Sequence, residues 1–489
     1  MGCVESCVVE EAPCGEVAKM AALPPSVMKA IQEARKLVDW EGFDKGRVEQ
    51  AIREMLAKID AVYTHYIENC VGCAACAPAC PYYPVSEKYG PVEKAEHARH
   101  IYRKEATLLG RLLGPLLDAK KPSKPEHLDM LVEAVYRCTN CGACYVSCPF
   151  GIDSGAIIKG LLAGLVSRAG RLPMLMAVFE ALERTESFLE MPAFQQIWNN
   201  VMEKAKEAIG KELPFDKPGS SYMLFVTMAD AMFYPDAVVG AVKILDRAGV
   251  DWTLPSKPMG FRPPIGAVVG FSDSAKEVLR RLDERISKLQ PQNLVLLDGG
   301  FVYLWMRWNL PKVLGRRPSY KVMHLVEFVH QMLREGRIKF RQVDDPVTWH
   351  DPCQLGRRSG VTKEPVEVLK AVSRGFRLLP HHGVESYCCG GGGGIGCLSM
   401  PMIEQMAKIV GVDPSMLITG EKERRFIERT QEAWAIAVKR KIDDIRKSKA
   451  KIVVTACPVC IHSIEGGARL YGLDIEVKHI GAYLADKLA

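Results

Sequence analysis

The stretch that decides the fold lies between residues 350 and 460, where five cysteines arrive in three groups. It contains His350-Asp351-Pro352-Cys353, then Cys388-Cys389 followed by glycines 390–394, then Cys457-Pro458-Val459-Cys460. Adjacent cysteines bridge poorly to each other, because a disulfide needs well-separated Cα atoms. Glycine lets the backbone wrap a bulky group, and thiolates suit iron or zinc. Four ligands would satisfy zinc, so five thiols point to an iron–sulfur centre.

This order of cysteines resembles the cysteine-rich CCG module of heterodisulfide reductases. The resemblance implies a non-cubane [4Fe-4S] cluster, at which a disulfide is cleaved, held by Cys353, Cys388, Cys389, Cys457 and Cys460. The gap from Cys389 to Cys457 is longer than the family usually shows. We expect the extra residues near Met400 to Glu421.

Length and composition indicate a large soluble protein. The 489 residues have room for about three domains at roughly 150 residues each. The 17 cysteines are clustered and unevenly spaced, which is typical of metal ligands in a reducing compartment rather than of a disulfide scaffold. The mild net charge of +7 fits general solubility, and we expect no nucleic-acid partner.

Neither a secretory signal nor a membrane span is expected. Met1–Glu11 is acidic and lacks a basic-then-apolar pattern. No apolar run approaches the ~18 residues that span a bilayer, because Lys159 interrupts the run from Ile157 to Val166. We therefore expect a cytoplasmic protein that is membrane-associated through partner subunits. Residues 1–24 are expected to form a tail, in which Cys3, Cys7 and Cys14 are either free thiols or part of a metal site completed by another chain.

A four-cysteine motif occurs twice. It reads Cys70-x-x-Cys73-x-x-Cys76-x-x-x-Cys80-Pro81 and then Cys138-x-x-Cys141-x-x-Cys144-x-x-x-Cys148-Pro149. This is the bacterial ferredoxin run, in which three thiolates bind one cubane [4Fe-4S] cluster and the fourth crosses to the other. We assign Cys70, Cys73, Cys76 and Cys148 to one cluster, and Cys138, Cys141, Cys144 and Cys80 to the other. Two zinc sites are the alternative, but this is not a zinc-finger spacing.

The fold class is α/β, with an N-terminal α-helical ferredoxin domain carrying both motifs and then two α/β CCG modules in pseudo-duplicate. Helical periodicity over residues 25–68, Ala95–Leu113 and His127–Tyr136 predicts a helical domain at 25–215. Pro214–Gly219 is a Pro/Gly-rich linker. Strands then alternate with helices, which is typical of a parallel sheet.

The α/β part is expected to contain a CCG-like module at 220–340 and a cluster-binding CCG module at 341–489. The expected strands are Met223–Thr227, Ala267–Gly270 and Asn293–Asp298, and then Val347–Trp349, Phe376–Leu379 and Ile452–Ala456. Asn293–Asp298 falls where Lys451–Ala456 does, which indicates an internal duplication. The first copy contains no cysteine, so we expect two copies of the fold but only one cluster-binding site.

Several polar residues flank the cysteines. His350 and Asp351 lie at a predicted strand end, where α/β sheets place ligands. They either give a proton to a leaving thiolate, or Asp351 caps a turn while His350 packs. Three further histidines are candidate proton donors: His381, His382 and His462. Three cations either steer an acidic substrate or form a solvated face: Arg357, Arg358 and Lys363. Cys397 is a sixth ligand, a redox thiol or a buried cysteine.

The whole plan, over about residues 60–485, resembles the D subunit of heterodisulfide reductase. Because only the second copy keeps its cysteines, it looks closer to the DsrK type of the DsrMKJOP complex and to archaeal menaquinol-oxidising relatives. The resemblance implies a disulfide oxidoreductase subunit in dissimilatory sulfur metabolism. Such a subunit passes electrons between a quinone-linked membrane cytochrome b partner and a disulfide or trisulfide on a DsrC-like sulfur carrier, within a complex of further subunits.

Two other functions fit the same motifs. One is the electron-transfer subunit of a flavin-dependent glycolate, lactate or glycerol-3-phosphate dehydrogenase, whose chemistry takes place on a separate flavoprotein. The other is a structural adaptor whose clusters hold the fold. The sequence contains no Rossmann glycine fingerprint, so we expect no flavin or nucleotide in this chain.

Overall fold

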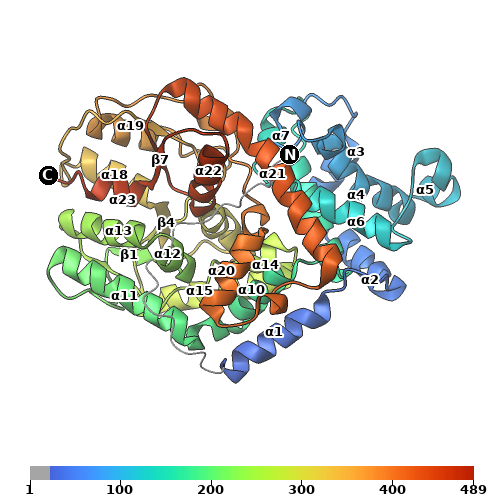
Figure 1. The fold of residues 1–489 in the computed structure, drawn as a ribbon, viewed down its shortest axis with the longest axis horizontal. Coiled ribbons are helices and arrows are strands. Elements are labelled where there is room, and N and C mark those ends of the chain that lie inside the picture. The colour runs from blue at the N-terminus through green and yellow to red at the C-terminus, as the bar shows by residue number, and fades with distance from the viewer. Residues whose placement is uncertain (1–22) are drawn as a thin grey trace.

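The computed structural model describes residues 23–489, and Cys3, Cys7 and Cys14 lie outside this range. Helices form one side of the molecule and two small sheets with their helices form the other, while α21 runs diagonally between them (Figure 1). The chain is therefore a mixed helical and sheet protein, with helices leading into parallel α/β structure.

The N-terminal part is helical because its apolar residues recur at helical spacing. In α1, Val27, Ala30, Ile31 and Ala34 are buried along one face, the spacing of an amphipathic helix. The helices of this part are α1 (Pro25–Leu37), α2 (Lys45–Leu56), α3 (Ala61–Glu68), η1 (Ala77–Ala79), η2 (Glu87–Tyr89), α4 (Pro91–Ala106), α5 (Leu108–Leu112), η3 (Gly114–Leu117), α6 (Pro125–Tyr136), α7 (Ala143–Val146), α8 (Ser154–Ala156), the π-helical η4 (Ile157–Leu162), α9 (Ala163–Arg168), α10 (Met174–Thr185), η5 (Ser187–Glu190) and α11 (Pro192–Ile209).

The first sheet has four parallel strands in the order β2-β1-β3-β4. Its strands are β1 (Tyr222–Phe225), β2 (Trp252–Thr253), β3 (Asn293–Leu296) and β4 (Lys321–His324). Its helices are α12 (Met228–Phe233), α13 (Pro235–Arg247), α14 (Ile265–Val268), α15 (Ser272–Leu289), α16 (Phe301–Leu304), η6 (Trp305–Asn309), α17 (Leu310–Leu314) and α18 (Leu325–Arg334).

The second sheet has three parallel strands in the order β5-β6-β7. Its strands are β5 (Val347–Trp349), β6 (Ile452–Thr455) and β7 (Glu476–His479). Its helices are α19 (Lys363–Val372), η7 (Gly383–Glu385), η8 (Ile395–Cys397), α20 (Met400–Val410), η9 (Pro414–Met416), α21 (Gly420–Ser448), α22 (Pro458–Leu470) and α23 (Ile480–Ala485).

Two expected strands are wrong. Ala267–Gly270 is not a strand, because Ile265–Val268 forms the short helix α14. Periodicity alone cannot show whether a short apolar run is a strand or a helix. Phe376–Leu379 forms no ladder and contributes a single bridge, from Arg377 to Thr348. The sheets are completed instead by β2, β4 and β7.

The two sheets meet at the carboxyl ends of their strands. The Leu297 carbonyl faces ring Nε2 atoms of both His324, at 2.8 Å, and His479, at 3.1 Å. These histidines end β4 and β7, and they pair in register with Leu296 and Thr455. Leu296 of β3 therefore occupies the position that Thr455 has in β6. This match differs by one residue from the match expected from the sequence, so Asp298 occupies the position that Cys457 has beside the other sheet.

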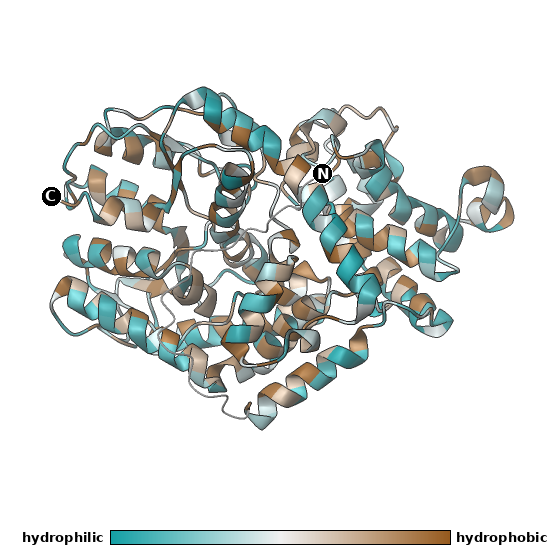
Figure 2. Ribbon diagram, viewed as in Figure 1, coloured by the Kyte–Doolittle hydropathy of each residue, from teal (hydrophilic) through white to brown (hydrophobic). Residues whose placement is uncertain are grey.

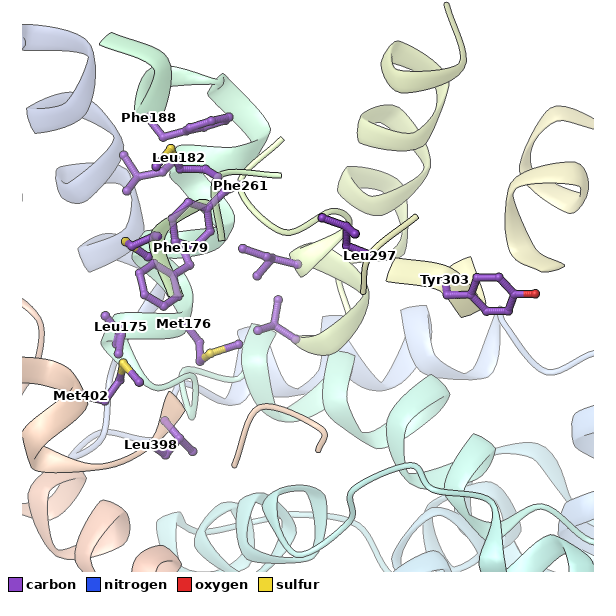
Figure 3. Close-up of a cluster of buried hydrophobic side chains, with 14 of the residues drawn as sticks. Leu175, Met176, Phe179, Leu182, Phe188, Phe261, Leu297, Tyr303, Leu398 and Met402 are labelled. Atoms are coloured by element: carbon purple, nitrogen blue, oxygen red, sulfur yellow. The ribbon is translucent and has the colours of Figure 1, made fainter. Parts of the chain in front are cut away.

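One apolar core joins the helical part to both sheets, and Figure 3 shows the part of it around Phe179, Phe261 and Met402. The Phe179 side chain of α10 packs against Phe261 of the first α/β unit, with ring centroids 5.0 Å apart. Met176 of α10 and Met402 of α20 belong to the same buried cluster. Because this core is continuous, it fixes the cysteine loops of the helical part relative to those of the second sheet.

Candidate metal centres

The first cavity lined by cysteines lies close to the surface. Its thiols come from Cys70, Cys73, Cys76 and Cys148, and Cys73 is exposed whereas Cys76 is buried. Burial, and then the neighbouring thiolates, raises the pKa of Cys76 to about 11. Four sulfurs crowded in this way are better accommodated as metal-bound thiolates than as free thiols.

The second cavity lies deeper and is lined by Cys80, Cys138, Cys141 and Cys144. In both cavities, the fourth cysteine comes from the other motif. Ser154 lines both cavities, so the two are adjacent.

A buried cation lies against the second cavity. Lys94 is 2% exposed, and its Nζ lies 3.5 Å from the Cys80 sulfur while donating to the Arg137 carbonyl at 2.6 Å. Burial acts to lower the pKa of Lys94, but attraction to the Cys80, Cys138 and Cys144 thiolates outweighs it and raises that pKa. The ammonium group is therefore charged beside these sulfurs.

The third site gathers five sulfurs from three loops. Cys353 follows β5, Cys388 and Cys389 open the glycine loop, and Cys457 and Cys460 lie at the start of α22. The sulfurs form a continuous series of interacting neighbours, from Cys353 to Cys388, Cys389, Cys460 and Cys457. All five line one cavity of about 170 Å³.

Glycines leave the space around this site. A Cβ on Gly300, in the first α/β unit, would lie 2.5 Å from the Cys457 sulfur. A Cβ on Gly392 would lie 2.8 Å from the Thr139 carbonyl oxygen of the ferredoxin motif. Gly393 has φ +68° and would clash with the Cys138 carbonyl. The glycine run therefore allows the cysteine loop to lie directly against the second cavity.

The second and third sites touch each other. The Cys141 and Cys388 sulfurs are interacting neighbours, and the Cys388 sulfur lies 3.4 Å from Thr139 Oγ1. Arg358 Nε donates to the Asn140 carbonyl at 3.0 Å and pairs with Asp153 at 2.8 Å. These contacts hold the ferredoxin loop and the five-thiol site at a fixed, short separation.

His350 is aimed at the five thiols. One of its ring nitrogens lies with the sulfurs of Cys389 and Cys460 in a group whose atoms are all within 4.8 Å of one another. The side chain is 1% exposed, and neither ring nitrogen has a hydrogen-bond partner among the described residues. Burial, and then Lys441, lowers the pKa of His350 well below its usual value. A buried imidazole without partners fits a site that holds a further group.

Asp351 is occupied locally. Its Oδ1 accepts from Trp349 Nε1 at 3.1 Å and its Oδ2 accepts from the Gly383 amide at 2.8 Å. Both carboxylate oxygens are therefore engaged inside the protein, in contacts that join the end of β5 to the segment before the glycine loop.

The other three histidine candidates differ in whether they line the cavity. His462 lines the cavity, and burial lowers its pKa. His381 lies 2.8 Å from an Asp444 oxygen and 2.9 Å from the Tyr387 hydroxyl, and His382 Nδ1 lies 2.9 Å from the Leu379 carbonyl. Of the three, only His462 is among the residues that line the cavity.

The four remaining candidates differ in their surroundings. Cys397 lines the cavity without joining the series of sulfur contacts. Arg357 donates to the Cys141 carbonyl at 3.0 Å and to the Val384 carbonyl at 2.7 Å, so Arg357 and Arg358 bind backbone and carboxylate groups inside the protein. Lys363 is exposed and is the one of the three cations free to meet a charged partner.

Sequence reasoning missed three cations around the cavities. Nothing in the sequence around Lys94 indicates that this residue lies beside a cysteine-lined cavity. Lys159 was visible only as a break in an apolar run; the π-helical η4 carries its Nζ to the Gly393 carbonyl at 2.8 Å, and burial lowers its pKa to about 8. Arg262 lines the cavity and pairs with Asp298 at 2.8 Å. The sequence does not reveal this pair, because the two residues are brought together only by the fold.

Comparisons with known proteins agree with these sites. The family described as "4Fe-4S dicluster domain" matches residues 66–152. The family described as "Cysteine-rich domain", or CCG, matches residues 347–410 and 423–465. The unmatched residues 411–422 overlap the stretch in which we expected extra residues.

Curated relatives are similar over most of the chain. One is the D subunit of the dihydromethanophenazine:CoB–CoM heterodisulfide reductase of Methanosarcina acetivorans, 24% identical over 88% of this chain and 96% of the relative. Another is the Hdr-like menaquinol oxidoreductase iron–sulfur subunit 2 of Archaeoglobus fulgidus, 26% identical over 77% of this chain and 75% of the relative. A third is the Hdr-like menaquinol oxidoreductase iron–sulfur subunit of Archaeoglobus profundus, 25% identical over 75% of this chain and 73% of the relative.

Proposed function

We propose that this chain, a homologue of the heterodisulfide reductase D subunit and of Hdr-like menaquinol oxidoreductase iron–sulfur subunits, is the catalytic subunit of a membrane-associated complex of sulfur metabolism. It passes electrons between a quinone-linked membrane cytochrome b partner and a disulfide or trisulfide on a DsrC-like sulfur carrier. The observation that carries the proposal is the convergence of five thiols on one cavity, with the Cys141 sulfur against Cys388.

The cofactors we propose are two cubane [4Fe-4S] clusters and one non-cubane [4Fe-4S] cluster. The first two cavities supply four thiols each and the third supplies five. When bound, the third cluster supplies single electrons and an iron able to hold a substrate sulfur. Disulfide cleavage takes two electrons, which the two cubane sites would deliver in turn.

The order of the sites supports electron transfer between a partner at the protein surface and the interior cavity. Side chains beside the first cavity are exposed and apolar: Val71 at 65% and Phe150 at 48%. Val71 and Phe150 also line that cavity. We propose that the electron-exchanging partner docks here, since an apolar rim around an exposed redox centre favours close approach.

The protein's own groups prepare the third cavity for sulfur chemistry. His350 would donate a hydrogen bond towards the sulfurs of Cys389 and Cys460, where it has no other partner among the described residues. Phe179, Phe261 and Phe301 line the same cavity and limit access of water. A thiolate formed in such a dry site is stabilised chiefly by hydrogen bonds and nearby cations.

We propose that the first α/β unit, residues 220–340, is a CCG-like module that has lost its ligands but still completes the site of the second, residues 341–489. It provides Gly300, which leaves room for Cys457. It also provides Arg262, which lines the cavity and is paired with Asp298. The helical domain of residues 25–215 provides the two cubane sites.

Electron paramagnetic resonance of the oxidised holoprotein with added thiol tests the proposal. We expect a paramagnetic signal that appears only with thiol, disappears in Cys388→Ser and persists in the control Cys397→Ser. The absence of a thiol-dependent signal, or a signal indifferent to Cys388, would contradict the proposal.

Purification of the native complex separates this function from the flavin-dependent alternative. A co-purifying haem b membrane protein supports the proposed function. A flavoprotein dehydrogenase partner would instead assign this chain to electron transfer for that enzyme.

A further inference from the structure

A short projection of the helical part carries six exposed leucines. The exposed fractions are 71% for Leu108, 61% for Leu109, 70% for Leu112, 43% for Leu113, 81% for Leu116 and 39% for Leu117. Residues 107–118, which contain α5 and η3, are called the leucine knob below. It stands out from the body of the molecule beyond α4 and α6 (Figure 1), and brown segments gather on it in Figure 2. Soluble proteins normally expose such side chains singly rather than in a group.

The base of the leucine knob is anchored, so its shape is defined. Thr107 Oγ1 accepts from the Gly110 amide at 3.0 Å and donates to the Arg103 carbonyl at 2.8 Å. Asp118 pairs with His100 at 3.3 Å and with Lys120 at 2.8 Å. The leucines are therefore held outward by local bonds rather than exposed by fraying.

The leucines form a broad apolar surface rather than a narrow stripe. They come in adjacent pairs, 108/109, 112/113 and 116/117, and both members of every pair are exposed. Helical residues four apart lie on the same side, so Leu108 and Leu112 share one side of α5 and the leucines form a broad apolar surface at the end of the projection. An acyl layer, which is fluid, can cover a broad protruding apolar surface of this kind.

Basic residues surround the base of the leucine knob. Residues 103–124 contain six Lys or Arg and two Asp or Glu, which gives a net charge of +4. The Lys120 and Lys124 side chains are 64% and 58% exposed, and each also lies near one carboxylate, Asp118 at 2.8 Å and Glu126 at 3.9 Å. Apolar side chains at a tip and cations behind them match the layering of an anionic lipid surface, with acyl chains inside and charged headgroups outside.

We propose that the leucine knob inserts into the acyl boundary of an anionic membrane while the lysines behind it contact the headgroups. Among residues 23–489, no helix is long and apolar enough to cross a membrane, so this contact would be interfacial. The inference goes beyond the proposed function, in which the membrane is reached through a partner protein, and it stands without that function.

Flotation of the purified holoprotein with vesicles tests the proposal. We expect binding to vesicles of phosphatidylcholine with phosphatidylglycerol, and weaker binding to phosphatidylcholine alone. The variant Leu112→Gln/Leu116→Gln should lose binding at least tenfold, and Lys120→Gln/Lys124→Gln should lose the dependence on phosphatidylglycerol. The matched control is Met130→Gln/Leu470→Gln, which removes two exposed apolar side chains elsewhere and should bind as the wild type does.

Iron content and circular dichroism identify any variant that fails to fold, and both should be unchanged because the substituted side chains face solvent. Two results would overturn the proposal. One is wild-type protein that does not float with anionic vesicles. The other is a leucine variant that floats as well as the wild type; if that variant also loses a co-purifying protein, the knob is a protein-docking element instead.

Discussion

Replacing Lys94 with Met should make the midpoint potential of one cubane cluster more negative by about 100 mV. The Lys94 ammonium lies 3.5 Å from the Cys80 sulfur and is buried. At that separation a charge pair is worth at most about 5 kcal/mol with an effective dielectric constant of ~20, and roughly half when the charge is spread over a cluster. For a one-electron couple, ~59 mV corresponds to about 1.4 kcal/mol, which gives this shift. The sign is negative because the lost cation favoured the reduced, more anionic state.

Potentiometric titration followed by electron paramagnetic resonance measures this shift in the purified holoprotein. The control is Lys88→Met, because Lys88 has a side chain 64% exposed and its charge is screened by water. The shifted couple should be the one lost in Cys138→Ser, whose thiol lines the same cavity. Unchanged couples in Lys94→Met, or an equal shift in Lys88→Met, would refute the reasoning.

Three further predictions follow from the same contacts. Cys389→Ser should lower bound iron from about twelve to about eight atoms per chain, whereas Cys397→Ser should leave it unchanged; elemental analysis decides. Arg262→Met should destabilise the fold by about 3–5 kcal/mol in denaturant titrations, because it leaves the 2% exposed Asp298 unpaired, and adding Asp298→Asn should restore most of the loss; no restoration would contradict the pairing. Burial lowers the pKa of His479 to about 4 from its ordinary 6.5, so the unfolded chain takes up a proton first and stability falls as the pH drops from 6.5 towards 4. Between pH 7 and pH 5, His479→Gln should therefore lose about 2 kcal/mol less than the wild type, and parallel pH curves would count against a neutral buried His479.

The sequence was most informative where the determinants are local. Cysteine spacing within each motif fixes which thiols can share a loop, so the motifs predicted iron–sulfur chemistry and the order of the helical and α/β parts. The resemblance to the heterodisulfide reductase D subunit agrees with the similarity to curated relatives. The helix expected at His127–Tyr136 lies within two residues of α6 (Pro125–Tyr136), because its apolar periodicity is clear.

Features set by tertiary contacts could not be predicted. The apolar run at Ala267–Gly270 was assigned to a strand although Ile265–Val268 is helical, because its length cannot distinguish the two. The Lys94 ammonium is buried by segments far apart in sequence. Similarly, Leu108–Leu117 reads as an ordinary apolar helix end until the structure shows that nothing within the described chain covers it.

The convergence of five thiols on a single iron-bearing centre, beside two others, underlies the proposed chemistry. Anomalous diffraction from anaerobically grown crystals, measured on both sides of the iron absorption edge, tests this directly. We predict three iron peaks, the innermost bounded by Cys353, Cys388, Cys389, Cys457 and Cys460. Two iron peaks with nothing among these five sulfurs, or a peak there that disappears at the iron edge and appears at the zinc edge, would contradict it.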